Sequence, residues 1–466
     1  MKEKELENNL KNITPKDKVY QLMQRFIEDS INDPELKVLL DRIPQVSLIA
    51  TDSYFLHYSV YPFLKAQNPD KIMEQARKTK LEYMASEQYQ KVKSLTTLDD
   101  QLSKIYSITL LKELLKKLKE QIEENYRQQT GQQAGLQQIL QQLQQQYGSG
   151  WQQQFNKMVQ QALQQMTKQQ KGKSSMFQQA LNSAVQQAQK DTETANKVRQ
   201  LIGGKEAGKE EGTFEKILDL TEQIKRTRMR DVLSFSERLM ANMPRFSKIG
   251  KVKDKRGTEI AGYRVTKNIN EVIARELALP EELFLKKLAG NGFLAREKQR
   301  VSEGSIYVLI DKSGSMDGEK TIWSRSVALA LFKLAQQKKR RYFLRFFDTK
   351  VYPKEPISEK TEILEHIIKI RSDGGTNISR ALFEAIKDIT SIKELKETTN
   401  TIVIITDGED EIMEKELKTA LKENKIRLIS VMIKGDNEDL KKISDEYFRT
   451  ELTSEDALTL IKEAEK

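Results

Sequence analysis

The spacing of apolar residues predicts helices over the first part of the chain. Up to about Tyr126, apolar side chains recur at intervals of three and four, as in residues 20–31 and 98–126. This spacing gathers them on one face of a helix, so the other face can meet water. We therefore expect a helical N-terminal domain over residues 1–127.

Glutamine dominates the next segment, residues 128–202, without erasing the helical spacing. Leu136, Ile139 and Leu143 still recur at three and four residues, and a similar stripe follows Trp151. A persistent apolar period favours glutamine-faced helices over an aggregating low-complexity tract. We expect this Gln-rich segment to be helical or mobile.

We expect a helical and basic connecting region over residues 203–300. A helical stretch over 214–243 is followed by the basic run 245–256, with the sequence RFSKIGKVKDKR. Ahead of them, residues 203–210 have the glycine and lysine spacing of a phosphate-binding loop. However, Glu210 stands where such a loop needs a hydroxyl, and no strand precedes it. We expect no nucleotide site there.

Beyond residue 301 short apolar runs alternate with amphipathic helices. The runs cover residues 306–310, 342–347, 401–406 and 426–433. Continuous apolar runs suit strands that are buried on both faces, as in a parallel sheet covered by helices. The fold class expected is therefore α/β, with a C-terminal doubly wound, mostly parallel sheet over 301–466 and a largely helical region before it.

The amino-acid composition limits the kinds of metal site and partner that this chain can have. The 466 residues include no cysteine and two histidines, so thiolate sites and multi-histidine zinc sites are excluded. The formal charge is +11, and the basic excess lies before residue 301. Such an excess could attract nucleic acid, an acidic protein partner or a membrane surface. The charged N-terminus and the lack of an apolar run near ~18 residues predict a cytoplasmic protein without a membrane span.

Hard oxygen donors follow the predicted strands of the C-terminal region. Asp311, Ser313 and Ser315 follow the first strand in the spacing D-x-S-x-S, Thr376 precedes a helix, and Asp407 follows another strand. Ligands of such sheets bind at the carboxyl ends of the strands. Carboxylates and hydroxyls with nearby glycines suit Mg²⁺, or another hard divalent cation such as Mn²⁺ or Ca²⁺. The sequence predicts a metal site there.

These five residues resemble the metal-ion-dependent adhesion site of von Willebrand factor A domains, in that family's chain order. The resemblance implies that Asp311, Ser313, Ser315 and Thr376 surround the metal, and that Asp407 acts through water. It also implies a protein partner whose Glu or Asp completes the coordination.

A second resemblance lies just upstream. Residues 274–295 are similar to the lead-in of intracellular CoxE-like and ViaA-like proteins, which work with MoxR-type AAA+ ATPases. This resemblance implies a non-enzymatic adaptor in protein or metalloenzyme assembly, with a MoxR-type ATPase as a partner.

Two alternatives remain open from the sequence. Ro-type RNA-binding proteins also join a helical region to a C-terminal domain of this kind, and the basic residues of 203–300 would contact phosphate. A phosphotransferase would use Asp311 as its nucleophile, but such enzymes usually place a second acid two residues on, where this chain has Ser313.

Overall fold

The computed structural model describes most of the chain. The described residues are 6–168, 174–202, 213–226, 229–243, 251–253, 259–290, 292–301, 303–357, 360–370, 372–395, 398–408 and 410–465. They fall into two compact units that divide after residue 226, and each unit is described by itself. None of the helices among these residues is long and apolar enough to cross a membrane.

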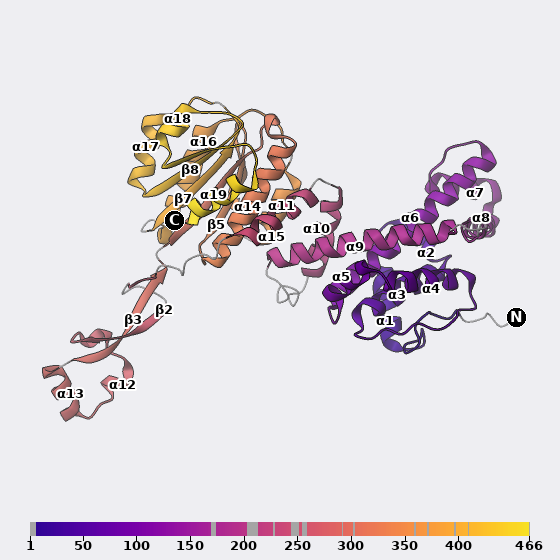
Figure 1. The fold of residues 1–466 in the computed structure, drawn as a ribbon, viewed down its shortest axis with the longest axis horizontal. Coiled ribbons are helices and arrows are strands. Elements are labelled where there is room, and N and C mark those ends of the chain that lie inside the picture. Colours follow the sequence, from indigo (N-terminus) through magenta and orange to yellow (C-terminus); the bar gives the residue numbers. More distant parts are fainter. Residues whose placement is uncertain are drawn as a thin grey trace. The chain divides into compact units, whose positions relative to one another are not determined.

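The first unit is helical, as its apolar spacing predicts (Figure 1). Its Gln-rich segment is helical too, in α7, α8 and α9. The helices are α1 (Lys18–Asp29), α2 (Pro34–Leu40), α3 (Pro44–Tyr58), α4 (Lys71–Met84), α5 (Glu87–Thr96), α6 (Asp100–Thr130), α7 (Leu136–Tyr147), α8 (Trp151–Met166), α9 (Met176–Ile202) and α10 (Thr213–Arg226).

The long helix α6 organises this unit. Asp99 caps its start by accepting a hydrogen bond from the Leu102 N–H at 3.1 Å, and Gly131 ends it with a φ of 72°. Between these ends its leucine and isoleucine face packs against α3 and α9. Arg199 on α9 forms an ion pair with Asp99 at 2.7 Å, so the cap residue also joins the two helices.

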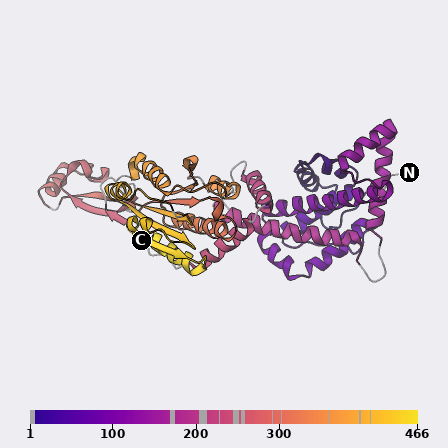
Figure 2. The ribbon, with the colours of Figure 1, turned by 90° about the horizontal axis from the view of Figure 1, so that it is seen from above.

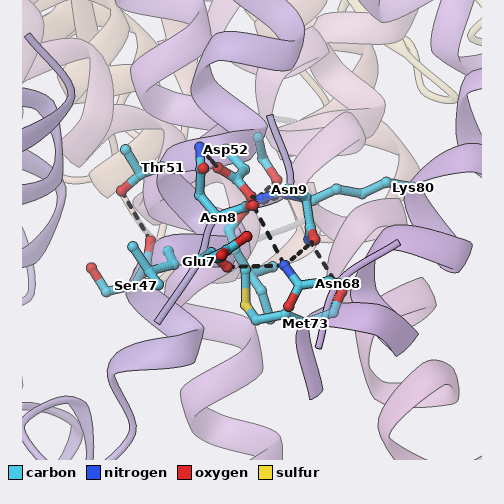
Figure 3. Close-up of polar contacts among 12 residues, drawn as sticks. Glu7, Asn8, Asn9, Ser47, Thr51, Asp52, Asn68, Met73 and Lys80 are labelled. Atoms are coloured by element: carbon cyan, nitrogen blue, oxygen red, sulfur yellow. Dashed lines mark hydrogen bonds and ion pairs between the residues drawn. The ribbon is translucent and has the colours of Figure 1, made fainter. Parts of the chain in front are cut away.

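A buried polar network holds the N-terminal segment against this bundle (Figure 3). Asp52 on α3 is fully buried and accepts hydrogen bonds from the Asn8 side chain at 3.2 Å, the Asn9 N–H at 2.9 Å and the Tyr20 hydroxyl at 2.9 Å. The ammonium of Lys80 lies 3.7 Å from the same carboxylate. Buried charges need such partners, so Asp52 keeps all of its hydrogen bonds only while residues 8 and 9 stay docked.

The second unit contains a six-stranded sheet with the order β6-β5-β4-β7-β8-β9. All neighbouring strands are parallel except β6, which runs antiparallel to β5. The strands are β4 (Glu303–Asp311), β5 (Tyr342–Phe347), β6 (Val351–Ile357), β7 (Thr399–Thr406), β8 (Ile426–Ile433) and β9 (Glu446–Thr450). The helices are α11 (Met229–Asn242), α14 (Glu319–Gln337), α15 (Lys360–Lys369), α16 (Ile378–Ser391), α17 (Glu414–Glu423), α18 (Glu438–Ile443) and α19 (Ser454–Glu465).

Helices cover both faces of this sheet (Figures 1 and 2). Apolar residues of α16, α17 and α18 form one core with the strands, while α14 and α19 pack together on the sheet's other side. This arrangement confirms the predicted α/β fold, because strands such as Tyr342–Phe347 are buried throughout.

Helix α11 packs on α14 and so belongs to the second unit. The Ser326 hydroxyl on α14 donates a hydrogen bond to the Val232 carbonyl on α11 at 3.0 Å. The contacts therefore divide the chain after residue 226, whereas the domain divisions after residues 127, 202 and 300 stay predictions.

An antiparallel ribbon precedes the sheet in the sequence, within the region 203–300 that was expected to be helical and basic. It consists of β1 (Lys251–Lys253), β2 (Glu259–Thr266) and β3 (Phe293–Val301), with the short helices α12 (Ala274–Leu277) and α13 (Glu281–Ala289) between β2 and β3. Val265 on β2 pairs with Leu294 on β3, and both side chains are exposed.

The basic run 245–256 is described only at 251–253, and residues 203–210 lie outside the described part of the chain.

Candidate metal site

Three loops meet at the carboxyl edge of the central strands. Because β4 lies between β5 and β7 in parallel register, Asp311 ends beside Phe347, and Ile310 pairs with Ile405. Asp407 directly follows β7, so both carboxylates of the predicted site lie at one edge. This is the edge where open α/β sheets bind ligands.

The D-x-S-x-S loop turns its hydroxyls toward the second carboxylate. Asp311 accepts a hydrogen bond from the Ser313 N–H at 2.8 Å, which closes the turn after β4. The Ser313 and Ser315 hydroxyls lie 3.1 Å apart, and the Ser315 hydroxyl donates to Asp407 at 2.8 Å. These four residues therefore form one connected group.

Thr376 joins this group from a third loop. Its hydroxyl lies 3.4 Å from Asp311 Oδ2, and the residue is partly buried. Gly408 packs directly beneath it, since a Cβ on Gly408 would lie 2.8 Å from Thr376 Cγ2 and 3.0 Å from its hydroxyl. The structure thus brings all five predicted residues together.

Lys312 fixes the loop that carries Thr376. Its ammonium forms ion pairs with Asp348 at 2.7 Å and Asp373 at 2.6 Å. The Asp348 carbonyl accepts a hydrogen bond from the Asn377 N–H at 2.9 Å. Gly374 adopts a φ of 88° against Asp348, where a side chain would be strained. The position of the Thr376 hydroxyl is therefore determined by contacts outside the five predicted residues.

Burial disfavours the negatively charged form of the carboxyl groups at this site. The Asp311 side chain is only 2% exposed, and this burial, opposed by its hydrogen bonds, raises the pKa of the carboxyl above its ordinary value. Asp407 adds to the increase by its like charge. A cation held between these carboxylates would relieve both effects.

The donors fit a hard divalent cation. Two carboxylates and three hydroxyls provide oxygen ligands, and a site with few charged ligands leaves room for water or for another ligand on Mg²⁺. In the described ranges of the chain, no group of three or more Asp, Glu or His side chains is placed to hold a metal. The hydroxyls are therefore an essential part of any cation site at this edge.

Two residues at this edge, Thr406 and Lys320, were not included in the sequence prediction. The Thr406 hydroxyl donates to Asp311 and accepts the Gly408 N–H at 3.0 Å. The Lys320 ammonium forms an ion pair with Asp407. Thr406 could have been recognised as the last residue of its strand, but nothing in the spacing marks Lys320, which is 87 residues from its partner.

Comparisons with known proteins find a family match for the C-terminal part of the second unit. Residues 305–464 match the sequence profile of the von Willebrand factor type A domain. An uncharacterized protein of Methanocaldococcus jannaschii is 31% identical over 220 residues, which are 44% of this chain and 50% of that protein. A protein of the Acidianus two-tailed virus, named for a VWFA domain, is 25% identical over 277 residues, 55% of this chain and 30% of that protein. The chain thus spans half or less of these relatives' length.

Two solved structures are also similar. The von Willebrand factor type A protein from Catenulispora acidiphila is 19% identical with a TM-score of 0.28, covering 36% of this chain and 44% of that one. Proximal thread matrix protein 1 from the mussel byssus, solved with a zinc-occupied MIDAS motif, is 13% identical with a TM-score of 0.27, covering 35% and 45%. The profile match and the mostly parallel sheet between two helical layers show that residues 305–464 are a von Willebrand factor type A domain, preceded in this chain by a largely helical region.

Proposed function

We propose that this chain is a metal-dependent protein-interaction adaptor. Its C-terminal domain would hold a divalent cation, with Mg²⁺ as the expected ion, through Asp311, Ser313, Ser315, Thr376 and Asp407. The observation that carries this proposal is the convergence of these five oxygen donors from three loops at one sheet edge. When bound, the ion supplies an open position that accepts a carboxylate oxygen.

The partner expected at this position carries a Glu or Asp side chain. An anionic oxygen that replaces water on a divalent ion gains Coulomb energy in a partly buried cleft. Ser313, Ser315 and Thr376 contribute no charge, so the bound ion retains positive charge toward the partner. The recognised feature is therefore an exposed acidic side chain on another protein.

A binding role fits these residues better than catalysis. Asp311, the nucleophile of the phosphotransferase alternative, has one oxygen engaged by the Ser313 N–H and the other by the hydroxyls of Thr406 and Thr376. Ser313 stands where such enzymes place a second acid. We therefore propose that the chain is not itself an enzyme.

A MoxR-type AAA+ ATPase is the partner that we propose on the strength of the CoxE-like and ViaA-like resemblance of residues 274–295. Part of that segment exposes apolar side chains in the structure, namely Leu277, Leu283, Leu285 and Leu294. Exposed apolar residues in such number are typical of protein interaction surfaces. The helical first unit would bind a second protein, such as a client.

RNA binding remains the second candidate. Tyr263 is 63% exposed on β2 and available for base stacking, as this alternative requires. Its neighbour Arg264 forms an ion pair with Glu271, which reduces its value for phosphate contacts. Phe246, the other stacking candidate, lies outside the described residues. Binding that falls steeply with salt and ignores EDTA would favour RNA.

The metal proposal is tested by titrating the full chain with Mn²⁺ and following free ion by electron paramagnetic resonance. We expect Asp311→Ala to abolish binding, Thr376→Ala to weaken it and Thr376→Ser to restore it, because serine keeps the hydroxyl. Thermal unfolding should change little, since these side chains lie on loops. Asp439→Asn, an acid on α18 paired only with Lys442 among the ion pairs described, is the matched control.

Partner capture is tested separately with immobilised protein in Mg²⁺ or EDTA. We expect acidic partners to elute with EDTA from the wild type and to be missing from Asp311→Ala. Full capture by Asp311→Ala in EDTA would refute the adaptor mechanism and leave the ribbon or the helical unit as the contact.

A further inference from the structure

A lysine of this chain forms an ion pair with one carboxylate of the candidate metal site. Lys320 is the second residue of α14, and its ammonium forms an ion pair with Asp407 Oδ2. The Asp407 side chain is 3% exposed and that of Lys320 is 25% exposed. The pair is thus largely removed from water, so salt screens it less than a surface ion pair.

The position of Lys320 in its helix is unfavourable by itself. Helix N-termini carry partial positive charge and favour acidic residues, so a cation in the first turn is repelled. The turn at Gly318, with a φ of 81°, starts α14 close to the metal loop and brings Lys320 to Asp407. The carboxylate therefore compensates for the cation's placement.

Both oxygens of Asp407 have partners within this chain while this arrangement lasts. Its Oδ1 accepts the Ser315 hydroxyl at 2.8 Å, and its Oδ2 is paired with Lys320. A divalent ion that uses Asp407, directly or through water, must compete with an ammonium of the same sign. The free energy gained when the ion binds is therefore reduced by the free energy of the Lys320–Asp407 ion pair that the ion disrupts.

We propose that Lys320 is an internal competitor of the divalent cation and sets the affinity of this site. The inference rests on the proposed metal site and adds its regulation. With Lys320 on Asp407 the charge of that carboxylate is compensated without metal, and the site loads only when the free concentration of the ion is high enough to displace the ammonium. Lys320 therefore lowers the affinity of the site for a divalent ion.

The test compares Mn²⁺ affinities of the full chain by electron paramagnetic resonance and calorimetry. We expect the neutral variants Lys320→Gln and Lys320→Met to bind Mn²⁺ at least tenfold more tightly than the wild type, and Lys320→Arg to remain close to it. Lys333→Gln removes the same charge from the same helix, roughly 20 Å further along its axis, and should bind as the wild type does.

A double-mutant cycle separates competition at Asp407 from a general charge effect. In an Asp407→Asn background, Lys320→Gln should change Mn²⁺ affinity by less than threefold, because the competed carboxylate is gone. Equal tightening in both backgrounds would overturn the proposal.

The outcomes also distinguish this inference from the proposed function. If the wild type binds Mn²⁺ and both neutral variants bind no more tightly, Lys320 is no competitor and the metal site stands. If neither the wild type nor the neutral variants bind Mn²⁺ while folded, both the metal site and the inference are refuted.

Discussion

Gly408 offers a way to perturb the candidate metal site without removing a ligand or a charge. A Cβ added there would lie 2.8 Å from Thr376 Cγ2, 3.0 Å from its hydroxyl oxygen and 3.1 Å from its Cβ. Ordinary van der Waals contact begins near 3.4 Å, so Gly408→Ala must displace Thr376 by about 0.6 Å. Gly408 itself has no left-handed φ that would strain an alanine.

This displacement is large on the scale of magnesium coordination. Mg²⁺ requires near-octahedral geometry with oxygens at roughly 2.0–2.1 Å, so a hydroxyl moved by half an ångström is lost as a ligand. Changes to residues that position ligands typically weaken metal binding about 10- to 100-fold. We therefore expect Gly408→Ala to cost about 1.4–2.7 kcal/mol of binding free energy, at about 1.36 kcal/mol for each factor of ten.

The assay is calorimetric titration with Mg²⁺ and Mn²⁺, with thermal unfolding as the check on folding. Gly375→Ala is the matched control, because it makes the same change next to Thr376 and its Cβ would meet only Thr349 Cγ2, at 3.4 Å. Wild-type affinity in a folded Gly408→Ala protein would refute the role of Thr376 as a ligand. Equal losses in both alanine variants would refute the steric explanation.

Two further predictions concern the buried network of the helical unit. Asp52→Ala leaves the Lys80 ammonium buried without its carboxylate and deprives Asn8, Asn9 and Tyr20 of their acceptor. We therefore expect the free energy of unfolding, measured with urea and circular dichroism, to fall by about 3–5 kcal/mol. A fall below about 1 kcal/mol would contradict the network's role. Burial, opposed by Asp52, lowers the pKa of Lys80 to about 8, so above pH 8 the unfolded chain holds a proton that the folded chain has lost, and stability should rise by up to about 1.4 kcal/mol per pH unit. Urea titrations between pH 8 and 9.5 should show this contribution in the wild type and its loss in Lys80→Met; equal slopes would refute it.

Local rules in the sequence were sufficient to predict the α/β domain. Runs such as IYVLI and the IVII of residues 402–405 are apolar at every position, a pattern typical of a strand that is covered on both faces. The structure places them as the adjacent parallel strands β4 and β7. Parallel pairing then brings Asp311 and Asp407 to one edge, because both follow the carboxyl end of a strand.

The ribbon of β2 and β3 shows where local rules fail. The short helices α12 and α13 lie in the region 203–300 that was expected to be helical and basic, but the strands on either side of them were not predicted. β3 reads FLAREKQRV, in which charged residues interrupt any alternation, so its strand character depends on pairing with β1 and β2. Strand propensity of this kind reflects the partner strand more than the residues themselves.

The sequence by itself determined the α/β class and the helical N-terminal region, because each follows from spacing along the chain. It also predicted the five candidate oxygen donors, from their positions after strands or before a helix and from the family resemblance. Only the tertiary structure decided that Lys320 meets Asp407, that Gly408 supports Thr376 and that Asp52 anchors residues 8 and 9. These contacts join residues that lie 32 to 87 positions apart in the sequence. Hydrophobic spacing determines which face of an element is buried, whereas the pairing of particular polar groups depends on how the folded elements meet.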